Sequence, residues 1–490
     1  MSGADGDILF VCGARRVSRA EHRERVARAA TVLGELGVDN GDTVGIALRN
    51  CPEFFELLAA AAAIGAKAVP IAWRLKRDEV RYLVDDSHAR VVFHDAESAG
   101  SMAGLPAISL EEYEARLAQA EPAAGIEAGA GQPQMELYSS GTTGRPKAIE
   151  REMPPLTPSQ RASLGSLGFL RILGVEQAGE VHLVCGPLYH SQPIGFATGA
   201  LSAGHRVVLM PGSFDAETCL AAIERERVSW ITCVPTHLIR ILALPREVRA
   251  RYDLSSLKAV LHSAAPCPRD VKAAAMALLP PGTVWEIYGG TEGAITMISP
   301  DEALAKPGSV GKPFMPGAEV RILDEAGDPL PPGVPGLIYA TPMMKFRYRG
   351  AQQLDQQTWR GDLFTLGDVG YVDEDGYLFI TDRQKDMIIS GGANIYPAEV
   401  EAVLFNHPAV GDATVIGVPD PQWGEKVKAI VEPRGETSEA EIIAFCRANL
   451  AHYKCPVSVD LVATLPRDPN GKVRKRDLRE AYWADAGRAI

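Results

Sequence analysis

Segments with the pattern of buried strands alternate with segments of helical periodicity over roughly the first 300 residues, and this alternation constrains the fold more than any other feature. The strand-like runs are short and mainly apolar, as in the sequences TVGIAL, RVVFHD and WITCV. The predicted strands lie at residues 43–48, 66–71, 90–95, 181–186, 206–210, 230–234, 257–263 and 284–290. The predicted helices lie at residues 15–37, 50–64, 77–87, 195–203, 216–225, 237–244 and 269–279. This order predicts an α/β fold with doubly wound, mostly parallel sheets.

Residues 96–133 interrupt the alternation. They are rich in Ala, Gly, Glu and Pro and carry little periodic signal, so we expect them to cross the surface without regular structure. After Pro300 the pattern changes to short strands with turns, including the hairpin YVDEDGYLFI, which indicates a β-rich module.

The C-terminal hundred or so residues predict a small α+β unit, with one helix beginning at Pro397 and another at a capping box formed by Ser438 and Glu441. Because single cores stop growing at roughly 250 to 300 residues, a chain of 490 residues is expected to form two or three domains. The charged run DRQKD before the small unit is interpreted as a hinge. We expect a large N-terminal domain over residues 1–384 and a small, mobile C-terminal domain over residues 385–490.

Composition excludes several classes of protein. The net charge of −12 argues against a nucleic-acid partner, whose phosphates require a basic face. Eight cysteines stand singly with no CxxC, which favours a reduced, cytoplasmic compartment over a disulfide framework or a zinc site. The N-terminus lacks the basic lead of a signal peptide, and the longest apolar run, Leu57–Ala66, is about half the ~20 residues of a membrane span. No integral membrane contact is therefore expected.

The segment Tyr138–Glu150, with the sequence YSSGTTGRPKAIE, is too rich in turn formers to be the interior of a helix or strand. Its glycines allow the backbone to approach a ligand closely, so that N–H groups and hydroxyls can point at phosphate oxygens. Lys147 adds a positive charge. The pattern GxxxxGK followed by Ser or Thr is absent, which argues against a P-loop kinase or ATPase.

Five motifs occur in a fixed order along the chain: YSSGTTGRPK, YGGTEGA, GDVGYVDEDGYLFITDRQKDMI, IISGGANIYPAEVE and PRDPNGKVRKRDLR. Together they resemble the motifs of the adenylate-forming superfamily, which contains acyl-CoA synthetases, the adenylation domains of peptide synthetases and luciferases. The resemblance covers the chain from about Arg15 to Trp483. Ala148 stands where glycine is common, and Gly290 fills the variable position of the YGxTE motif. The family implies activation of a carboxylic acid with ATP and Mg²⁺, followed by transfer to coenzyme A.

The resemblance also assigns roles to particular residues. Catalytic roles fall to Lys472, which would touch the carboxylate and the α-phosphate, to Thr291 at the α-phosphate, to Glu292 as the magnesium ligand, and to His190 beside the carboxylate and the thiol tunnel. The residues implied to bind nucleotide or coenzyme A are Ser139, Ser140, Gly141, Thr142, Thr143, Gly144, Lys147, Ala264, Ala265, Pro266, Tyr288, Gly289, Asp368, Arg383, Lys385, Gly391 and Gly392. Among these, Asp368 would accept the ribose hydroxyls, Lys385 would be the pivot, and the two last glycines would leave room for a pantetheine arm.

Each motif also has a purely structural interpretation. A lone histidine at a strand end is more often a core residue than a catalytic one, and a Gly-Gly-Thr-Glu sequence alone is an ordinary tight turn. The small-molecule partners expected are an acid, ATP and coenzyme A, and the sequence leaves a homodimer open. The segments expected to line the acid pocket are mainly apolar, which favours a hydrophobic or aromatic acid. These segments are residues 194–196, 236–237, 288 and 294–295.

Three alternative functions remain. An amide-forming ligase would use an amine to intercept the adenylate. A catalytically inactive binder of nucleotide or acid would retain the motifs without turnover. A carrier-linked adenylation module is less favoured, because the sequence given ends eighteen residues after Lys472.

Overall fold

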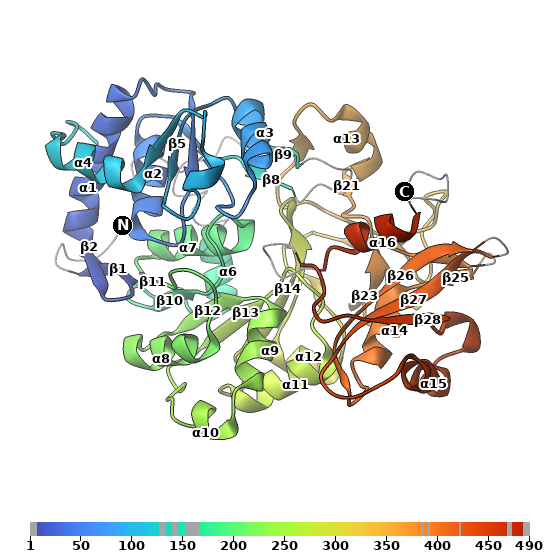
Figure 1. Ribbon diagram of the computed structural model, residues 1–490. Coiled ribbons are helices and arrows are strands. Elements are labelled where there is room, and N and C mark those ends of the chain that lie inside the picture. Colours follow the sequence, from blue (N-terminus) through green and yellow to red (C-terminus); the bar gives the residue numbers. More distant parts are fainter. Residues whose placement is uncertain are drawn as a thin grey trace. The chain divides into compact units, whose positions relative to one another are not determined.

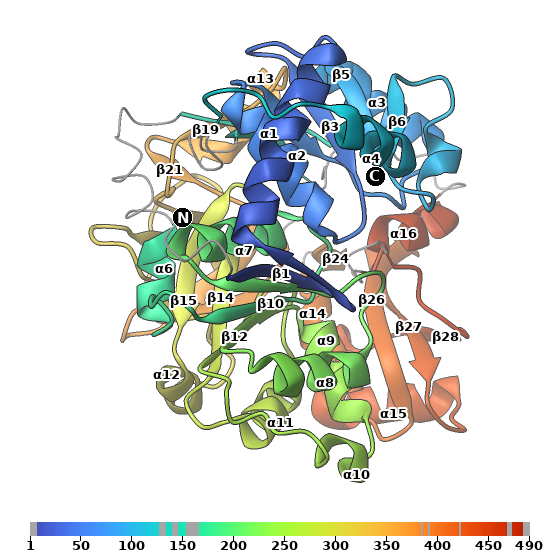
Figure 2. The same ribbon diagram turned by 90° about the vertical axis from the view of Figure 1, so that its left-hand side faces the viewer.

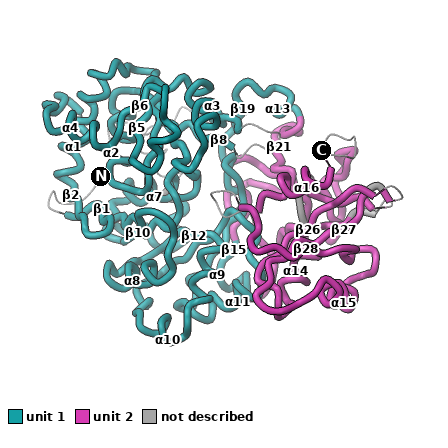
Figure 3. The backbone as a smooth tube through the Cα atoms, in the orientation of Figure 1, with its two compact units in different colours: residues 1–294, 298–304, 343–356 teal, residues 295–297, 305–342, 357–490 magenta. Residues whose placement is uncertain are grey.

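The computed structural model describes residues 7–126, 134–139, 146–152, 166–383, 386–390, 393–420, 423–467 and 473–483. The chain divides into two compact units (Figure 3). Unit 1 comprises residues 1–294, 298–304 and 343–356, and unit 2 comprises residues 295–297, 305–342 and 357–490. This grouping follows packing, so the predicted division at residue 385 stays a prediction. Among the described residues, no helix combines the length and apolar character needed to cross a membrane.

A five-stranded, all-parallel sheet begins unit 1, with strand order β6-β5-β3-β4-β7. Its strands are β3 (Thr43–Ala47), β4 (Lys67–Pro70), β5 (Ala89–His94), β6 (Ala107–Ser109) and β7 (Gln134–Met135). The helices of this part are α1 (Arg19–Glu35), α2 (Pro52–Ala63), α3 (Arg77–Ser87) and α4 (Leu110–Gln119), with a 3₁₀ turn at Ala99–Ser101. Figure 1 shows these helices around the sheet, where α2, α3 and α4 contact its strands. The predicted order of strands and helices is confirmed.

Two local predictions in this region are wrong. Residues Arg15–Ser18, expected to begin a helix, form strand β2 instead, and the helix starts at Arg19 with Ser18 as its N-cap. Residues 96–133 are not all irregular, because α4 lies within them. Its N-cap Ser109 accepts a hydrogen bond from the backbone N–H of Glu112 at 3.1 Å, which is an N-terminus signal that the Ala- and Glu-rich composition conceals.

The second sheet of unit 1 has the strand order β14-β13-β12-β10-β11-β1-β2, and its strands are parallel from β14 to β1. The strands are β1 (Ile8–Cys12), β2 (Arg15–Ser18), β10 (Val181–Val184), β11 (Arg206–Leu209), β12 (Trp230–Cys233), β13 (Ala259–His262) and β14 (Val284–Gly290), and β15 (Gly293–Ile298) follows. The helices are α6 (Ser166–Ile172), α7 (Ser191–Ala203), α8 (Ala216–Glu226), α9 (Pro235–Ala243), α10 (Arg246–Arg249), α11 (Arg269–Leu278) and α12 (Pro300–Ala305). Figure 2 shows α7 on one face of the sheet and α8 and α9 on the other, which confirms the doubly wound arrangement.

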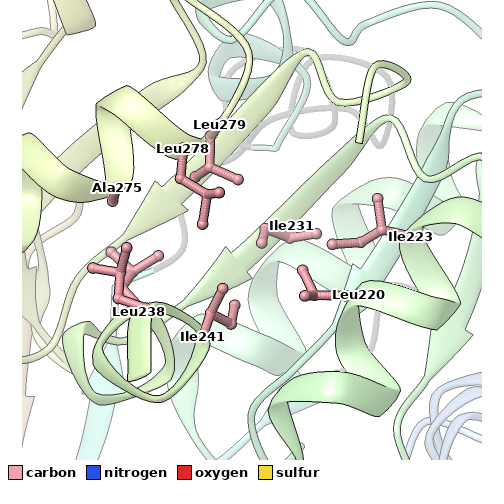
Figure 4. Close-up of a pocket in the computed structure, with 9 residues that line it drawn as sticks. Leu220, Ile223, Ile231, Leu238, Ile241, Ala275, Leu278 and Leu279 are labelled. Carbon is pink, nitrogen blue, oxygen red and sulfur yellow. The ribbon is translucent and has the colours of Figure 1, made fainter. Parts of the chain in front are cut away.

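Apolar side chains from α8, α9, α11 and the central strands fill the space between these helices and the sheet. A small cavity lies within this core (Figure 4). Leucine, isoleucine and alanine side chains line it, and it admits no more than a water-sized molecule. A cavity of this size and lining is a packing defect in the core and offers no polar group to a ligand.

A short antiparallel sheet completes unit 1, with the order β19-β9-β8. Its strands are β8 (Leu137–Tyr138), β9 (Ala148–Arg151) and β19 (Phe346–Tyr348), and α13 (Gln352–Thr358) follows β19. Strands β8 and β9 pair as the two arms of a hairpin. The predicted loop Tyr138–Glu150 is therefore too long at both ends, because Tyr138 belongs to β8 and residues 148–150 belong to β9.

Unit 2 contains the β-rich module and the small α+β part. The module's strands are β17 (Val320–Leu323), β18 (Gly336–Ala340), β20 (Trp359–Arg360), β21 (Leu363–Phe364), β22 (Asp368–Val372) and β23 (Leu378–Arg383). Strand β16 (Lys312–Pro313) pairs instead with residues 296–297 of β15. The α+β part has strands β24 (Ile388–Ser390), β25 (Ala393–Ile395), β26 (Val410–Asp420), β27 (Gly424–Pro433) and β28 (Ser458–Leu461), helices α14 (Pro397–Leu404), α15 (Glu439–Asn449) and α16 (Lys475–Trp483), and a 3₁₀ turn at His452–Lys454. The predicted hairpin β22–β23 and the helix starts at Pro397 and Ser438 are confirmed.

Candidate active site

The stem of the predicted phosphate loop is closed by backbone and side-chain hydrogen bonds. Tyr138 pairs with Ala148 across the hairpin, and Ser139 N–H donates to Lys147 O at 2.8 Å. Tyr82 on α3 donates its hydroxyl to Pro146 O at 2.8 Å, so the end of the loop is also tied to a helix. The described part of this loop comprises Ser139 and residues 146–147. The predicted ligands Ser140, Gly141, Thr142, Thr143 and Gly144 lie outside the described residues.

The YGGTEGA segment lies where β14 turns into β15. Gly289 closely approaches the next strand, because a Cβ atom placed on it would lie 2.7 Å from Ala294 Cα and would also meet Gly293 O. Arg151, at the end of β9, donates from Nη2 to Thr291 O at 2.5 Å. Burial lowers the pKa of Arg151, and the negative charge of Glu292 partly opposes this shift. Strand β9 thus connects the phosphate loop to the segment that carries Thr291 and Glu292.

Glu292 is half-buried and its carboxylate is oriented by a neighbour. Tyr348 on β19 donates its hydroxyl to Glu292 Oε1 at 2.7 Å. Neither Arg151 nor Tyr348 was found from the sequence. Arg151 comes directly after the segment Tyr138–Glu150, and Tyr348 stands on a strand that has no motif of its own. The structure therefore ties Thr291 and Glu292 to strands β9 and β19, and β9 begins directly after Lys147.

His190 is the N-cap residue of α7, lies in the turn after β10 and is half-buried. Burial lowers its pKa to about 3, so the imidazole is neutral at ordinary pH. Its Nε2 atom is buried and has no hydrogen-bond partner among the described residues, while its ring contacts Tyr189 at 4.2 Å between centroids. Asn50 holds the preceding turn, because its side chain donates to Gly186 O and accepts from Leu188 N–H, both at 2.9 Å. A neutral, buried imidazole can border a bound acid but carries no charge to attract it.

The predicted adenine wall follows β13. Ala264 has a φ of 73°, a left-handed conformation that is uncommon for a residue with a Cβ and costs on the order of 1 kcal/mol. Such strained residues cluster at ligand sites, which agrees with the predicted role of Ala264, Ala265 and Pro266. Tyr288 and Gly289 stand at the end of the adjacent strand β14. The carboxyl ends of neighbouring parallel strands thus carry both predicted nucleotide segments, as expected for an open α/β sheet.

The other predicted residues belong to unit 2. Asp368 is 5 % exposed and its backbone pairs with that of Arg383 across the β22–β23 hairpin, so both stand at one end of the hairpin. Gly391 and Gly392 fall between the paired residues Ser390 and Ala393. These two glycines, Lys385 and Lys472 lie outside the described residues, and the side chain of Arg383 is not described.

Comparison with known proteins decides the family. The family model described as "AMP-binding enzyme" matches residues 3–343, and the model of the AMP-binding enzyme C-terminal domain matches residues 399–472. The chain belongs to the AMP-binding enzyme family. It is 36% identical over 479 residues to a feruloyl-CoA synthase from an Amycolatopsis species, a match that covers 96% of this chain and 95% of that protein. The predicted adenylate-forming resemblance is confirmed.

Solved structures of the family have the same fold. ATP-bound MatB from Rhodopseudomonas palustris matches with a TM-score of 0.86 and 28% identity, covering 100% of this chain and 98% of that one. The O-succinylbenzoate coenzyme A synthetase of Bacillus subtilis, in complex with ATP and magnesium, matches at 0.82 and 27%, covering 97% and 96%. The amide bond synthetase McbA from Marinactinospora thermotolerans matches at 0.81 and 27%, covering 97% of each chain. The predicted fold is confirmed, as is the predicted enzyme class, an AMP-forming acyl-CoA synthetase that uses ATP, Mg²⁺ and coenzyme A.

Proposed function

We propose that this enzyme activates a hydrophobic or aromatic carboxylic acid to its acyl-adenylate and then transfers the acyl group to coenzyme A. The observation that carries the substrate class is a set of aromatic side chains around Phe196, which stands on α7 six residues after His190. Phe196 on α7 contacts Phe169 on α6 at 5.6 Å and Trp230 on β12 at 6.2 Å between ring centroids. Surroundings of this kind favour an apolar ligand. The similarity to a feruloyl-CoA synthase, named for an aromatic acyl group, supports the same class.

Glu292 is the residue we propose for Mg²⁺. Magnesium in nucleotide sites is held by one or two carboxylates together with substrate phosphates and waters. Glu292 offers a half-buried carboxylate whose Oε1 is already oriented by the Tyr348 hydroxyl, so it fits this ligand set. When bound, the ion neutralises negative charge on the phosphate oxygens.

The first half-reaction brings two anions together, and cations and N–H donors must offset their repulsion. Two unit charges at 4 Å repel by about 4 kcal/mol at an effective dielectric of 20. We assign Lys147 and the phosphate loop to the departing pyrophosphate, Thr291 to the α-phosphate and Lys472 to the contact between carboxylate and α-phosphate. A carboxylate oxygen attacks the α-phosphorus, and the bond to pyrophosphate breaks. Asp368 and Arg383 would hold the ribose.

The second half-reaction needs a different face of the C-terminal domain. We propose that rotation about Lys385 withdraws Lys472 and presents Gly391 and Gly392, whose lack of side chains leaves room for the pantetheine arm. The thiol sulfur then attacks the acyl carbonyl, and the bond to AMP breaks. His190, neutral because it is buried, would border the acyl group and the thiol path.

Substitution of Lys472 tests this division of labour. Lys472→Ala should lower adenylation by roughly 10²- to 10³-fold, the usual cost of one pre-organised charge, and leave thioester formation from preformed acyl-adenylate near the wild-type rate. Arg476→Ala is the matched control, because Arg476 is exposed and, among the described residues, its ion pair is with Glu480 one helical turn away. Equal loss of both half-reactions in Lys472→Ala would contradict the proposal.

A panel of acids assayed for AMP release tests the substrate class. Aromatic and long aliphatic acids should release AMP in the presence of coenzyme A, and short polar acids should not. The similarity to an amide bond synthetase makes amine acceptors the second candidate, so the panel is repeated with amines in place of coenzyme A. Amide formation without thioester formation would favour that candidate. ATP binding without AMP release from any acid would identify an inactive binder instead.

A further inference from the structure

Two consecutive residues at the end of β19, Tyr348 and Arg349, reach two separate parts of the candidate active site. Tyr348 contacts the β14–β15 turn, and Arg349 contacts the stem of the phosphate loop. Both residues lie in unit 1, together with Glu292, Asp86, Tyr138 and Glu136. No motif found in the sequence includes either of them.

Tyr348 is held rigidly while it donates to Glu292. Its side chain is buried, its ring packs edge-on against Phe346 with centroids 5.6 Å apart, and its backbone N–H donates to Asp355 Oδ1 at 2.8 Å. Its backbone also pairs with Ile149 on β9. The hydroxyl that reaches Glu292 Oε1 at 2.7 Å is therefore fixed by the fold before any ligand binds.

Arg349 ties both arms of the loop's stem. Its backbone N–H donates to Ala148 O at 3.0 Å, on the second arm. Its Nη2 atom donates to the hydroxyl of Tyr138 at 2.6 Å, on the first arm, and to Asp86 Oδ2 at 2.7 Å, on α3. Its Nη1 atom is paired with Glu136.

The charges of Arg349, Asp86 and Glu136, together with the Tyr138 hydroxyl, favour a single arrangement of these side chains. Burial alone would raise the pKa of Asp86, but hydrogen bonds from Arg349 and Tyr138 outweigh it and lower the pKa below its usual value. Tyr138 donates to Asp86 Oδ2 at 2.7 Å, so its hydroxyl is fixed from two sides. Removing the Arg349 guanidinium would leave the partly buried carboxylates of Asp86 and Glu136 without the cation that pairs with both. These two carboxylates therefore account for an arginine at residue 349.

We propose that Tyr348 and Arg349 are positioning residues for the bound metal and nucleotide. Tyr348 would orient the Glu292 carboxylate toward the metal, and Arg349 would hold the phosphate loop at the correct spacing from Glu292. This inference rests on the roles proposed above for Glu292 and the phosphate loop. It adds that β19 couples these two elements, which are about 150 residues apart in sequence.

Tyr348→Phe tests the first half of the proposal. The substitution keeps the ring and its packing and removes only the hydroxyl. Mn²⁺ binding to the complex with α,β-methylene-ATP, a nucleotide that cannot release pyrophosphate, is measured by electron paramagnetic resonance. The dissociation constant of Mn²⁺ should rise about 10-fold, the equivalent of one hydrogen bond to a charged group. An unchanged constant would overturn the role of Tyr348.

Two further variants separate positioning from general stability. Tyr113→Phe is the matched control, because the Tyr113 hydroxyl is buried and donates to Glu56 Oε2 at 3.3 Å, in a different part of unit 1. It should leave Mn²⁺ binding unchanged. Glu292→Gln provides the background for a double variant, in which Tyr348→Phe should have no further effect if it acts through Glu292. If Tyr348→Phe weakened Mn²⁺ binding as much in the Glu292→Gln background as in the wild type, the positioning role of Tyr348 would be contradicted.

Tyr138→Phe and Arg349→Lys test the second half. Both variants should raise the dissociation constant of α,β-methylene-ATP, measured by calorimetry without metal, by about 3- to 10-fold. Arg349→Lys keeps a cation beside Asp86 and Glu136 but loses the forked geometry. If it does not fold, Tyr138→Phe alone decides. Unchanged nucleotide affinity in Tyr138→Phe would overturn the role of the stem.

The outcomes for the wild-type enzyme keep this inference distinct from the proposed function. If the wild type binds neither Mn²⁺ nor the nucleotide, the proposed function fails. If the wild type binds both and the Tyr348 and Tyr138 variants match it, only the positioning proposal fails.

Discussion

Lys272 Nζ lies 2.6 Å from Glu286 Oε2, and both side chains are nearly buried between α11 and β14. His262 Nε2 is 3.9 Å from the same carboxylate oxygen, and burial lowers the pKa of His262 to about 4, so the lysine is the cation that pairs with Glu286. The pair supports the ends of β13 and β14, which carry Ala264 and Tyr288.

Breaking this pair should destabilise unit 1. Glu286→Gln leaves the Lys272 charge buried without its partner and should cost about 3 kcal/mol, as should Lys272→Met. The double variant Lys272→Met/Glu286→Gln should lose clearly less than the sum, because no unpaired charge remains. Urea unfolding followed by tryptophan fluorescence measures these losses. Additive losses would show that the two residues do not interact.

Six histidines with strongly lowered pKa values should make the enzyme sensitive to mild acid. Burial lowers their pKa values to about 3 or about 4, well below the usual 6.5. They are His22, His182, His190, His205, His237 and His262. The unfolded chain binds protons at these residues below about pH 6.5 while the folded chain does not, so stability is highest above that pH and falls as pH decreases toward 4.

Between the unfolded and folded pKa values, each of these histidines makes the free energy of unfolding change by up to about 1.4 kcal/mol per pH unit. His22→Gln removes one titrating group from a site outside the candidate active site. It should therefore reduce the dependence of the free energy of unfolding on pH by the contribution of one histidine. Chemical unfolding at pH values from 7.5 to 5 checks both expectations. A constant stability across that range would contradict them.

The periodic segments made most of the fold predictable. Runs such as TVGIAL on β3 and WITCV on β12 are short, apolar and bounded by helical segments, so only a mostly parallel sheet can accommodate their connections. Helix α3 was predicted at its observed bounds, Arg77–Ser87, because both its amphipathic pattern and its acidic first turn are local signals. Helix α4 was missed because its two buried residues, Tyr113 and Leu117, give too sparse a pattern in an Ala- and Glu-rich segment.

Residues of the candidate site could be predicted only where they belong to a recognisable sequence motif. Thr291 and Glu292 could be proposed because they stand together in YGGTEGA. Tyr348 could not, because its partner Glu292 is 56 residues away and nothing local to β19 shows which strand lies beside it. Pairings of this kind depend on tertiary packing, so the residues that support a motif emerge only from the structure.

The N-cap of α15 gives a local stability prediction. Glu441 N–H donates to Ser438 Oγ at 3.3 Å, and Ser438 N–H donates to Glu441 Oε2 at 2.9 Å. Ser438→Ala should destabilise α15 by about 1 kcal/mol, and Ser202→Ala, which removes an exposed hydroxyl within α7, should cost less. Hydrogen exchange of the α15 amides measures the local effect. Exchange at the wild-type rate would show that the cap contributes nothing.

The backbone hydrogen bond from Ser438 lowers the pKa of Glu441, so the contribution of this carboxylate is present above its usual pKa and is lost as pH falls through the lowered value. Because Ser438→Ala keeps this backbone N–H, the contribution of the Glu441 carboxylate should be lost in acid in both the wild type and Ser438→Ala. Exchange of the α15 amides should therefore accelerate in both proteins, while the hydrogen bond from Glu441 N–H to the Ser438 hydroxyl still distinguishes the wild type.

Gly289 should tolerate no side chain. A Cβ atom at this residue would lie 2.7 Å from Ala294 Cα, a distance that backbone atoms cannot relieve without separating β14 from β15. Since Thr291 and Glu292 stand in the turn between these strands, Gly289→Ala should displace both and lower acid-dependent ATP–pyrophosphate exchange by at least about 10-fold. Gly34→Ala is the control, because nothing lies within 4 Å of a Cβ atom there and alanine favours helix α1 by up to about 1 kcal/mol. The Gly34→Ala control should catalyse ATP–pyrophosphate exchange at the wild-type rate. If Gly289→Ala also exchanged at the wild-type rate, the turn would adapt to the alanine without moving Glu292.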